Sequence, residues 1–222
     1  MLKHGILMTP DLAEKAHKGD KTVTRRLIRP QPPEWWDTCH WEDPPSYKPR
    51  YRPGDIVAIK ETHWRWGYKK LKGLSVKNVP VYNFVAVDTQ PIVFAEPHLL
   101  AWTKTNVGYH KISSLFLPFD DARTHVEILS VRPEWLQDIT GDDAIAEGIE
   151  PPEGYCHPIR GDASVVDMKV EPRVIGHICK IDLAPPAVEQ FEGLWDSINF
   201  KRAPWESNPW VWRYSFKAVE KP

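Results

Sequence analysis

The chain has 222 residues, 41% hydrophobic and 27% charged, which is the balance of a soluble globular protein that can bury a sizeable core. A formal net charge of −1 excludes bulk electrostatic attraction to nucleic acid, so any such contact has to be local. No apolar run reaches membrane-spanning length, no secretory signal opens the chain, and three cysteines argue against a disulfide framework. We therefore expect a cytoplasmic protein without membrane partners.

The first elements are predicted by capping residues. An apolar strand over residues 6–8 precedes Thr9 as the N-cap and Pro10 as the first residue of a helix. Gly19 tolerates the left-handed conformation that ends helices. Residues 21–26 then leave in extended form, and side chains alternate between the two faces of an extended segment.

The middle of the chain contains the longest predicted loops. Residues 29–50 form a proline- and tryptophan-rich loop that ends in a turn at 52–55, before a buried strand over 56–61. We predict a flexible basic loop over 67–80, a strand over 81–87 and irregular structure over 88–118.

The second half contains two helices. A strand over 124–131 precedes a helix with Thr140 as N-cap and Gly148 at its end. Residues 150–185 read as a hairpin insertion with a strand over 174–183. A third helix follows, and its predicted core face consists of Phe191, Leu194, Trp195 and Ile198. A closing strand is predicted over residues 210–216.

This order of elements lacks the regular alternation of strands and helices found in doubly wound sheets. It predicts an α+β fold, namely a small mixed β-barrel with flanking helices. We expect one domain over residues 1–222, with long insertions near 29–50, 62–118 and 150–185.

Lys21 and Thr24 are the first candidates for chemistry. A threonine hydroxyl becomes a nucleophile when a base lies within hydrogen-bond reach, and a buried lysine can be that base. Strand alternation places the two on opposite faces, so a twist or bulge is needed for them to meet. The simpler interpretation is a basic strand that binds phosphates or surface acids.

Glu147 falls on the last helical turn, where an anion is unfavourable unless a cation compensates. It could pass a proton to a leaving amine. Glu61, at the end of the buried strand, could accept a hydrogen bond from a cytosine amine, or could instead form a salt bridge with Arg25 or Arg26. Trp64, which could stack on a base, and Ser114 complete the candidate substrate contacts.

A metal site is weakly indicated. Three cysteine–histidine pairs occur, but without the usual zinc-ligand spacing, so we predict neither a metal nor another cofactor; the pairs are Cys39-His40, Cys156-His157 and His177-x-Cys179.

Gly19-x-Lys21-x-x-x-x-Arg26 resembles the signature of the ASCH domain family, a branch of the PUA-like superfamily. Residues 52–62 are similar to the family's second block and residues 136–149 to its third. Residues 194–212 are similar to the closing block of its larger members. The resemblance implies a PUA-like β-barrel with flanking helices.

The family includes N4-acetylcytidine amidohydrolases whose catalytic lysine, threonine and glutamate match Lys21, Thr24 and Glu147. The resemblance therefore implies hydrolysis of N4-acylated cytidines without a cofactor, with Arg26 as an oxyanion contact. Two alternatives stay open, because family members are also described as RNA-binding modules and proposed as ribonucleases: a non-catalytic reader of RNA or modified bases, and an RNA-cleaving enzyme.

Overall fold

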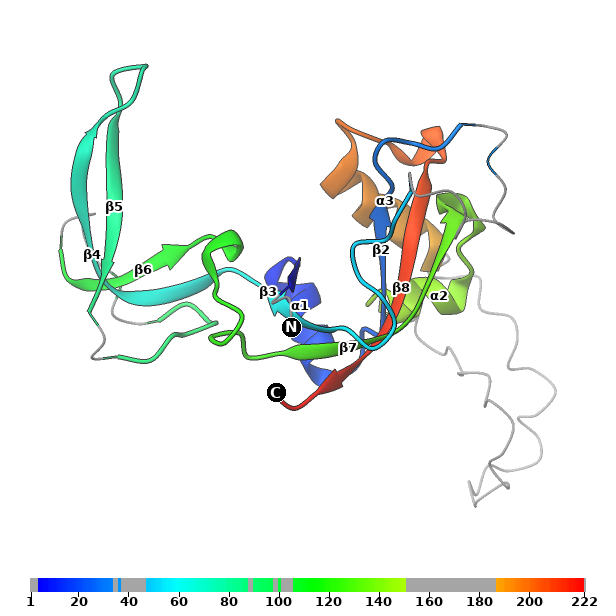
Figure 1. Cartoon of the computed structure of the whole chain (residues 1–222), viewed down its shortest axis with the longest axis horizontal. Helices are drawn as coiled ribbons and strands as arrows, with labels where there is room; N and C mark the ends of the chain where they lie inside the picture. The colour runs from blue at the N-terminus through cyan, green and yellow to red at the C-terminus, as the bar shows by residue number, and fades with distance from the viewer. Residues whose placement is uncertain are drawn as a thin grey trace, which may run out of the picture. The chain divides into compact units, whose positions relative to one another are not determined.

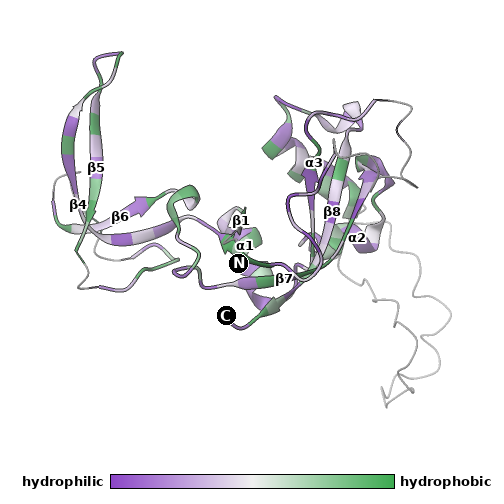
Figure 2. Cartoon of the chain, in the orientation of Figure 1, coloured by the Kyte–Doolittle hydropathy of each residue, from purple (hydrophilic) through white to green (hydrophobic). Residues whose placement is uncertain are grey.

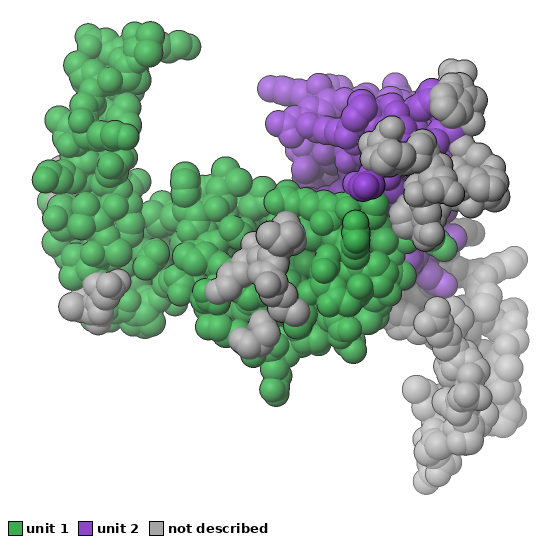
Figure 3. Space-filling view, viewed as in Figure 1, with its two compact units in different colours: residues 1–22, 49–132, 214–222 green, residues 23–48, 133–213 purple. Residues whose placement is uncertain are grey.

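A computed structural model describes residues 4–33, 36, 47–87, 90–97, 100, 106–150 and 187–221 (Figure 1). The three cysteine–histidine pairs and the strand predicted over 174–183 lie outside these residues. Long-range contacts divide the chain into two compact units (Figure 3). The first unit contains residues 1–22, 49–132 and 214–222, and the second contains residues 23–48 and 133–213.

The first unit begins with a strand, a helix and a parallel strand pair. Strand β1 (His4–Leu7) pairs in parallel with β3 (Ile56–Lys60). Helix α1 (Pro10–Lys18) starts after Thr9 and ends at Gly19, whose φ of 87° is left-handed. The predicted strand, helix and both helix ends are confirmed here.

The turn before β3 is also confirmed. The amide of Arg52 donates to the carboxylate of Asp55 at 2.7 Å, and Gly54 adopts a φ of 88°. A left-handed backbone conformation at that position favours glycine, because glycine has no Cβ. The turn delivers the chain into β3, where Val57, Ala58 and Ile59 are all fully buried.

Strand β7 (His125–Trp135) pairs antiparallel with β3, and β8 (Trp210–Val219) is the last strand. Both strands contribute residues to both units. The five-stranded sheet has the order β1-β3-β7-β8-β2, with β2 at Val23–Leu27. A mixed sheet with three described α-helices confirms the α+β class. Among the described strands β1 and β2 are the ends of this order, so the pairing shown is that of an open sheet.

A second sheet belongs entirely to the first unit. It has the order β5-β4-β6, from β4 (His63–Leu74), β5 (Pro80–Ala86) and β6 (Gly108–Ile112), and Figure 2 shows hydrophilic and hydrophobic segments interleaved along β4 and β5. The flexible loop predicted over 67–80 is therefore wrong, since this stretch forms one side and the turn of a hairpin. The prediction of irregular structure over 88–118 missed β6. The hairpin formed by β4 and β5 is largely exposed on both faces. Its sequence therefore lacks the alternation of polar and apolar residues that normally indicates a strand.

In the second unit, helix α2 (Gly141–Ala146) begins as predicted. The hydroxyl of Thr140 accepts a hydrogen bond from the amide of Asp143 at 3.2 Å. Helix α3 (Ala187–Asn199) packs against α2 and buries Ala187, Phe191 and Trp195.

One predicted core position of α3 is wrong. Ile198 is 53% exposed, although the 3.6-residue period placed it with Phe191 and Trp195. The buried residues of α3 recur every four positions, so the contact stripe turns slowly around the helix and leads toward Asn199 instead. Within the described ranges, no helix is long and apolar enough to cross a membrane.

Candidate functional site

Lys21 lies in the first unit, just after the left-handed end of α1. The backbone amides of Asp20 and Lys21 both donate to the carbonyl of Lys15, at 2.9 and 3.2 Å, which turns the chain back against the helix. The Lys21 side chain is only 2% exposed. Lysine is almost never fully buried unless its ammonium has partners, so this position calls for an explanation beyond packing.

Thr24 lies in β2 and belongs to the second unit, where it is 4% exposed. Its neighbours Val23 and Arg25 are also buried, so both faces of β2 are covered at this point. Because side chains alternate along a strand, Thr24 and Arg25 point to opposite faces of β2. Both are buried, so both faces of the strand are covered by other protein atoms. The approach of Lys21 to Thr24 remains a prediction.

Glu147 is the C-cap residue of α2 and is 4% exposed. Its carboxylate accepts a hydrogen bond from Arg25 Nη1 at 3.3 Å. The guanidinium of Arg25 is the cation that an acid at a helix C-terminus requires. The second unit therefore brings the arginine beside Thr24 to the acid at the end of α2.

Arg25 is the centre of a wider ionic cluster. Its guanidinium is fully buried, and it donates to Glu134 Oε1 at 2.7 Å and to Asp143 Oδ2 at 2.8 Å, besides Glu147. Arg213 Nη2 donates to the other oxygen of Asp143 at 2.6 Å. Burial raises the pKa of Asp143, but the hydrogen bond from Arg213 and the charge of Arg25 outweigh it, so this pKa lies below its ordinary value.

This cluster was not predicted from the sequence. Asp143 stands three residues after the Thr140 N-cap, where the sequence suggests only a capping role, and no pattern singles out Glu134 or Arg213. No sequence signal marks Glu134, because β7 also contains His125, Glu127 and Arg132. Their partner could not be named, because Arg25 and Glu134 are 109 positions apart.

Glu61 lies in the first unit, fully buried, with a partner that the sequence did not suggest. Arg123 donates from Nε to Oε1 at 2.7 Å and from Nη2 to Oε2 at 2.9 Å. The predicted partners were the arginines of β2. Because both carboxylate oxygens of Glu61 are engaged, a cytosine amine would have to share them.

The remaining predicted contacts are separated between the units. Arg26 is half-buried in β2 of the second unit. Trp64 is 8% exposed at the start of β4 in the first unit, with Lys111 Nζ 5.6 Å from its ring centre. Ser114 opens a short 3₁₀ helix in the same unit, after Ser113.

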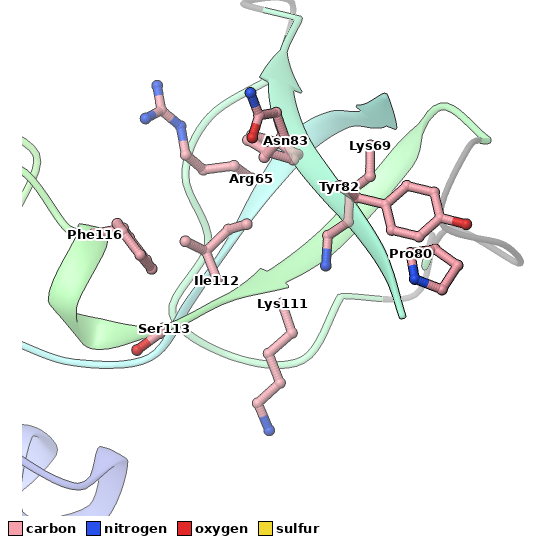
Figure 4. A pocket seen from close by; sticks show the side chains of 10 residues that line it. Arg65, Lys69, Pro80, Tyr82, Asn83, Lys111, Ile112, Ser113 and Phe116 are labelled. Carbon is pink, nitrogen blue, oxygen red and sulfur yellow. The ribbon is translucent and has the colours of Figure 1, made fainter. Parts of the chain in front are cut away.

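The described residues contain no group of three histidine, cysteine, aspartate or glutamate side chains that could hold a metal ion. A cavity of about 660 Å³ is formed in the first unit by the β5-β4-β6 sheet and the segment after it (Figure 4). None of the residues predicted for the site lines this cavity.

The sequence matches no family model and no curated protein. Among solved structures, the chain is similar to protein EF3133 from Enterococcus faecalis V583, described under the family name DUF984. The two share 10% identity with a TM-score of 0.38, over 99% of this chain and 82% of that one. A similarity of this size supports no conclusion about fold or function.

Proposed function

We propose that the protein is an amidohydrolase that removes the acyl group from N4-acylated cytidines. The observation that carries the proposal is the burial of all three residues matching the catalytic trio of the ASCH resemblance. The side chains of Lys21, Thr24 and Glu147 are exposed by 2%, 4% and 4%. Lysine and glutamate are almost never fully buried unless paired, so the burial of Lys21 and Glu147 together with Thr24 distinguishes these positions from ordinary surface residues. The PUA-like barrel is part of the same proposal.

In the proposed reaction, Lys21 acts as an amine base. Burial favours the uncharged form of an amine, which the role requires. Lys21 takes the hydroxyl proton of Thr24, and the Thr24 oxygen forms a bond to the acyl carbonyl carbon. Arg26 or a backbone N–H near Thr24 stabilises the oxyanion.

Collapse of this intermediate breaks the bond between the acyl carbon and N4 of cytosine. The proton taken by Lys21 passes to N4, so that cytidine leaves as a neutral amine. Glu147 accepts a hydrogen bond from the N4 group and positions it, while Arg25 fixes the carboxylate. Water then cleaves the acyl ester on Thr24 and releases a carboxylic acid. A direct route in which Thr24 only orients the water fits the same residues.

The test is cytidine release from N4-acetylcytidine in the presence of EDTA, followed by reversed-phase chromatography. We expect wild-type protein to release cytidine, and Lys21→Met and Thr24→Ala to lose at least about a hundredfold in rate, the contribution typical of acid–base and nucleophilic groups. Thr24→Ser keeps the hydroxyl and is the matched control, which should retain a measurable rate. Near-ultraviolet circular dichroism checks that each variant is folded.

The alternatives have distinct outcomes. If wild-type protein releases nothing from acetyl, benzoyl or other acyl cytidines, the amidohydrolase proposal is wrong. Cleavage of RNA that is lost in Lys21→Met would indicate a ribonuclease. RNA binding without turnover, weakening steeply with salt, would indicate a reader, since the KM of a nucleoside hydrolase should not follow ionic strength in that way.

A further inference from the structure

Strand β5 lies at one edge of the sheet in the first unit, whose order among the described strands is β5-β4-β6. Residues 81–86 of this strand contain no charged side chain and no proline, and Pro80 stands only at its first position. Proteins normally protect an edge strand with lysine or proline, because its outward backbone groups can pair with another chain. From residue 81 to residue 86, β5 carries neither protection.

The ladder between β4 and β5 shows which backbone groups face outward. Val87 donates to the carbonyl of Trp66 at 3.0 Å, so these two residues form a hydrogen-bonded pair. Hydrogen-bonded and non-hydrogen-bonded pairs alternate along an antiparallel ladder. By the strand register, Phe84 and Ala86 fall in the non-hydrogen-bonded positions, so their N–H and C=O groups point away from β4. Within the described ranges, neither residue has a backbone hydrogen bond on that side.

The side chain of Phe84 leaves this edge open. A Cβ at Gly67 would lie 2.7 Å from Cζ of Phe84, so the ring lies over β4 and not beyond β5. The ring of His110, in β6, meets the Phe84 ring edge-on, with centres 5.8 Å apart. Phe84 therefore packs toward the middle of the sheet, and a strand added beside β5 would not have to displace it.

The sheet behind this edge is positively charged. Residues 62–87 and 106–119, which contain its three strands, include no aspartate or glutamate. Lys69 and Lys70 are adjacent in β4, so their side chains leave opposite faces of the sheet. A strand added to β5 therefore meets positive charge on both faces. The same two ranges include six cationic side chains, namely Arg65, Lys69, Lys70, Lys72, Lys77 and Lys111.

These charges select the kind of strand that fits. An added strand would lie two strand spacings from β4, about 10 Å away. This distance is about one Debye length at 0.1 M salt, so the lysines of β4 act on the added strand. A second copy of β5 would bring the same lysines with it, and like charges repel. Charge therefore favours an acidic partner over a second copy of this chain.

A cavity of about 660 Å³ adjoins the same edge (Figure 4). Its lining includes Tyr82 and Phe84 of β5, together with Arg65 and Lys69 of β4. The register places these four side chains on one face of the sheet. In strand addition, pockets beside the edge select alternate side chains of the added strand. This cavity suits an acidic side chain, whose carboxylate can meet the two cations.

We propose that β5 is the docking edge for an acidic, extended segment of a partner protein, which adds to the sheet as a further strand. The outward backbone groups of Phe84 and Ala86 form hydrogen bonds with the segment, and the lysines of β4 select its charge. This docking does not depend on the proposed hydrolase activity, because it uses none of the residues proposed for catalysis.

The experiment begins with a random peptide library of about ten residues, the upper length of an ordinary strand, displayed on phage and selected against the full chain. We expect the enriched sequences to be rich in aspartate and glutamate, alternating with β-branched or aromatic residues. The affinity of the enriched peptides is then measured by fluorescence anisotropy. A selection that enriches no acid-rich sequence would overturn the proposal.

Strand addition is tested on the selected peptide itself. Only every second N–H group of an added strand faces β5. Two versions of the peptide therefore carry N-methyl groups on alternate residues, odd positions in one and even positions in the other. We expect one version to lose at least about tenfold in affinity and the other to bind like the unmodified peptide. Equal affinities of the two versions would rule out strand addition.

Ala86→Pro tests the edge of the protein. Ala86 is exposed and its N–H points outward, so proline removes this donor and leaves the ladder with β4 intact. We expect the selected peptide to bind at least about tenfold more weakly. Ala86→Ser keeps the N–H group and is the matched control, which should bind like wild type. Thermal unfolding confirms that both variants are folded, and equal binding by the two would contradict the proposal.

Two pairs of lysine substitutions separate this edge from general charge. Lys69→Gln with Lys70→Gln should weaken peptide binding by about tenfold. Lys18→Gln with Lys217→Gln removes two exposed lysines elsewhere in the same unit and should change little. Equal losses in the two pairs would show that the peptide is held by general charge alone.

Sedimentation of the protein without peptide tests the other occupant of the edge. We expect the same mass for wild type and Ala86→Pro, because the lysines of β4 oppose pairing between two copies. A wild-type dimer that Ala86→Pro converts to a monomer would assign the edge to a second copy of this chain and overturn the proposal.

Discussion

Glu61 and Arg123 form a two-pronged ion pair in which a fully buried carboxylate receives both of its hydrogen bonds from one guanidinium. Arg123 is itself held in place, because it also pairs with Glu14 at 2.7 Å and lies 5.1 Å from the ring centre of Phe94. The hydrogen bond and charge of Glu61 raise the pKa of Arg123 above its ordinary value. The Arg123 guanidinium of the pair therefore stays protonated, as arginine does in proteins generally.

Removing one partner of this pair should be costly. Arg123→Met leaves the Glu61 carboxylate buried without compensation, and we expect a loss of about 3–5 kcal/mol in the free energy of unfolding, measured with urea. Glu61→Gln combined with Arg123→Met should recover part of this loss, because no buried charge is then left unpaired. Glu14→Gln removes only the exposed partner and is the control. Equal stability of Arg123→Met and wild type would show that Glu61 finds another partner.

Arg25→Lys should also destabilise, although it keeps the charge. A lysine ammonium cannot reach Glu134, Asp143 and Glu147 with the fixed fork of a guanidinium, so at least one buried acid loses its donor. We expect a loss of about 2–4 kcal/mol in unfolding free energy. Arg202→Lys, an exposed position in the same unit, should have no measurable effect. A loss as small as that of Arg202→Lys would mean that the cluster contributes nothing to folding.

The two N-cap threonines should respond differently to alanine. The hydroxyl of Thr140 accepts a hydrogen bond from the Asp143 amide, whereas Thr9 makes no side-chain cap bond. Thr140→Ala should therefore cost about 1 kcal/mol by thermal or urea unfolding, and Thr9→Ala clearly less. Thr140→Ser retains the acceptor and should be close to wild type. The reverse order of the two alanine variants would contradict the hydrogen-bond assignment.

His63 should give the protein a pH-dependent stability. Burial lowers the pKa of this fully buried imidazole below its ordinary value of 6.5, more strongly than its hydrogen bond to the Glu61 carbonyl raises it. The unfolded chain therefore binds a proton at a higher pH than the folded one does. The stabilising contribution is complete above about pH 6.5 and is lost as pH falls below it toward the folded-state pKa.

The measurement is the free energy of unfolding between about pH 7.5 and 5 for wild type and His63→Asn, which cannot titrate. The difference between the two should fall with a slope approaching about 1.4 kcal/mol per pH unit. Because both proteins contain the other histidines, the contributions of those histidines to the pH dependence cancel in the difference. Parallel pH curves for the two proteins would show that the pKa of His63 is the same in the folded and unfolded states, which would contradict the prediction.

Local signals in the sequence were sufficient where the structure is determined locally. Helix α1 begins after Thr9 and ends at Gly19, and α2 begins after Thr140, because caps and left-handed glycines act within one turn of chain. The apolar run of β3 likewise predicted a buried strand, and the structure confirms it.

Tertiary contacts account for what was missed. The sequence of β4 shows no two-residue alternation of polar and apolar side chains, because the hairpin of β4 and β5 has no buried face. This is why the sequence predicts a loop there. Ile198 followed the helical period but not the actual line of contact between α3 and α2. For the candidate site, residue types predicted Lys21, Thr24 and Glu147, but only the fold could supply Arg25 as the partner of Glu147 and Arg123 as the partner of Glu61.

The interleaving of the two units has a consequence for biosynthesis. The first unit is assembled from three separate stretches, and the last of them, residues 214–222, contains Tyr214 and Phe216, which are 1% and 2% exposed. A ribosome releases this stretch after every other part of both units. The first unit therefore cannot complete its core until residues 214–222 have left the ribosome, and a nascent chain stalled before Tyr214 should remain protease-sensitive and dependent on chaperones.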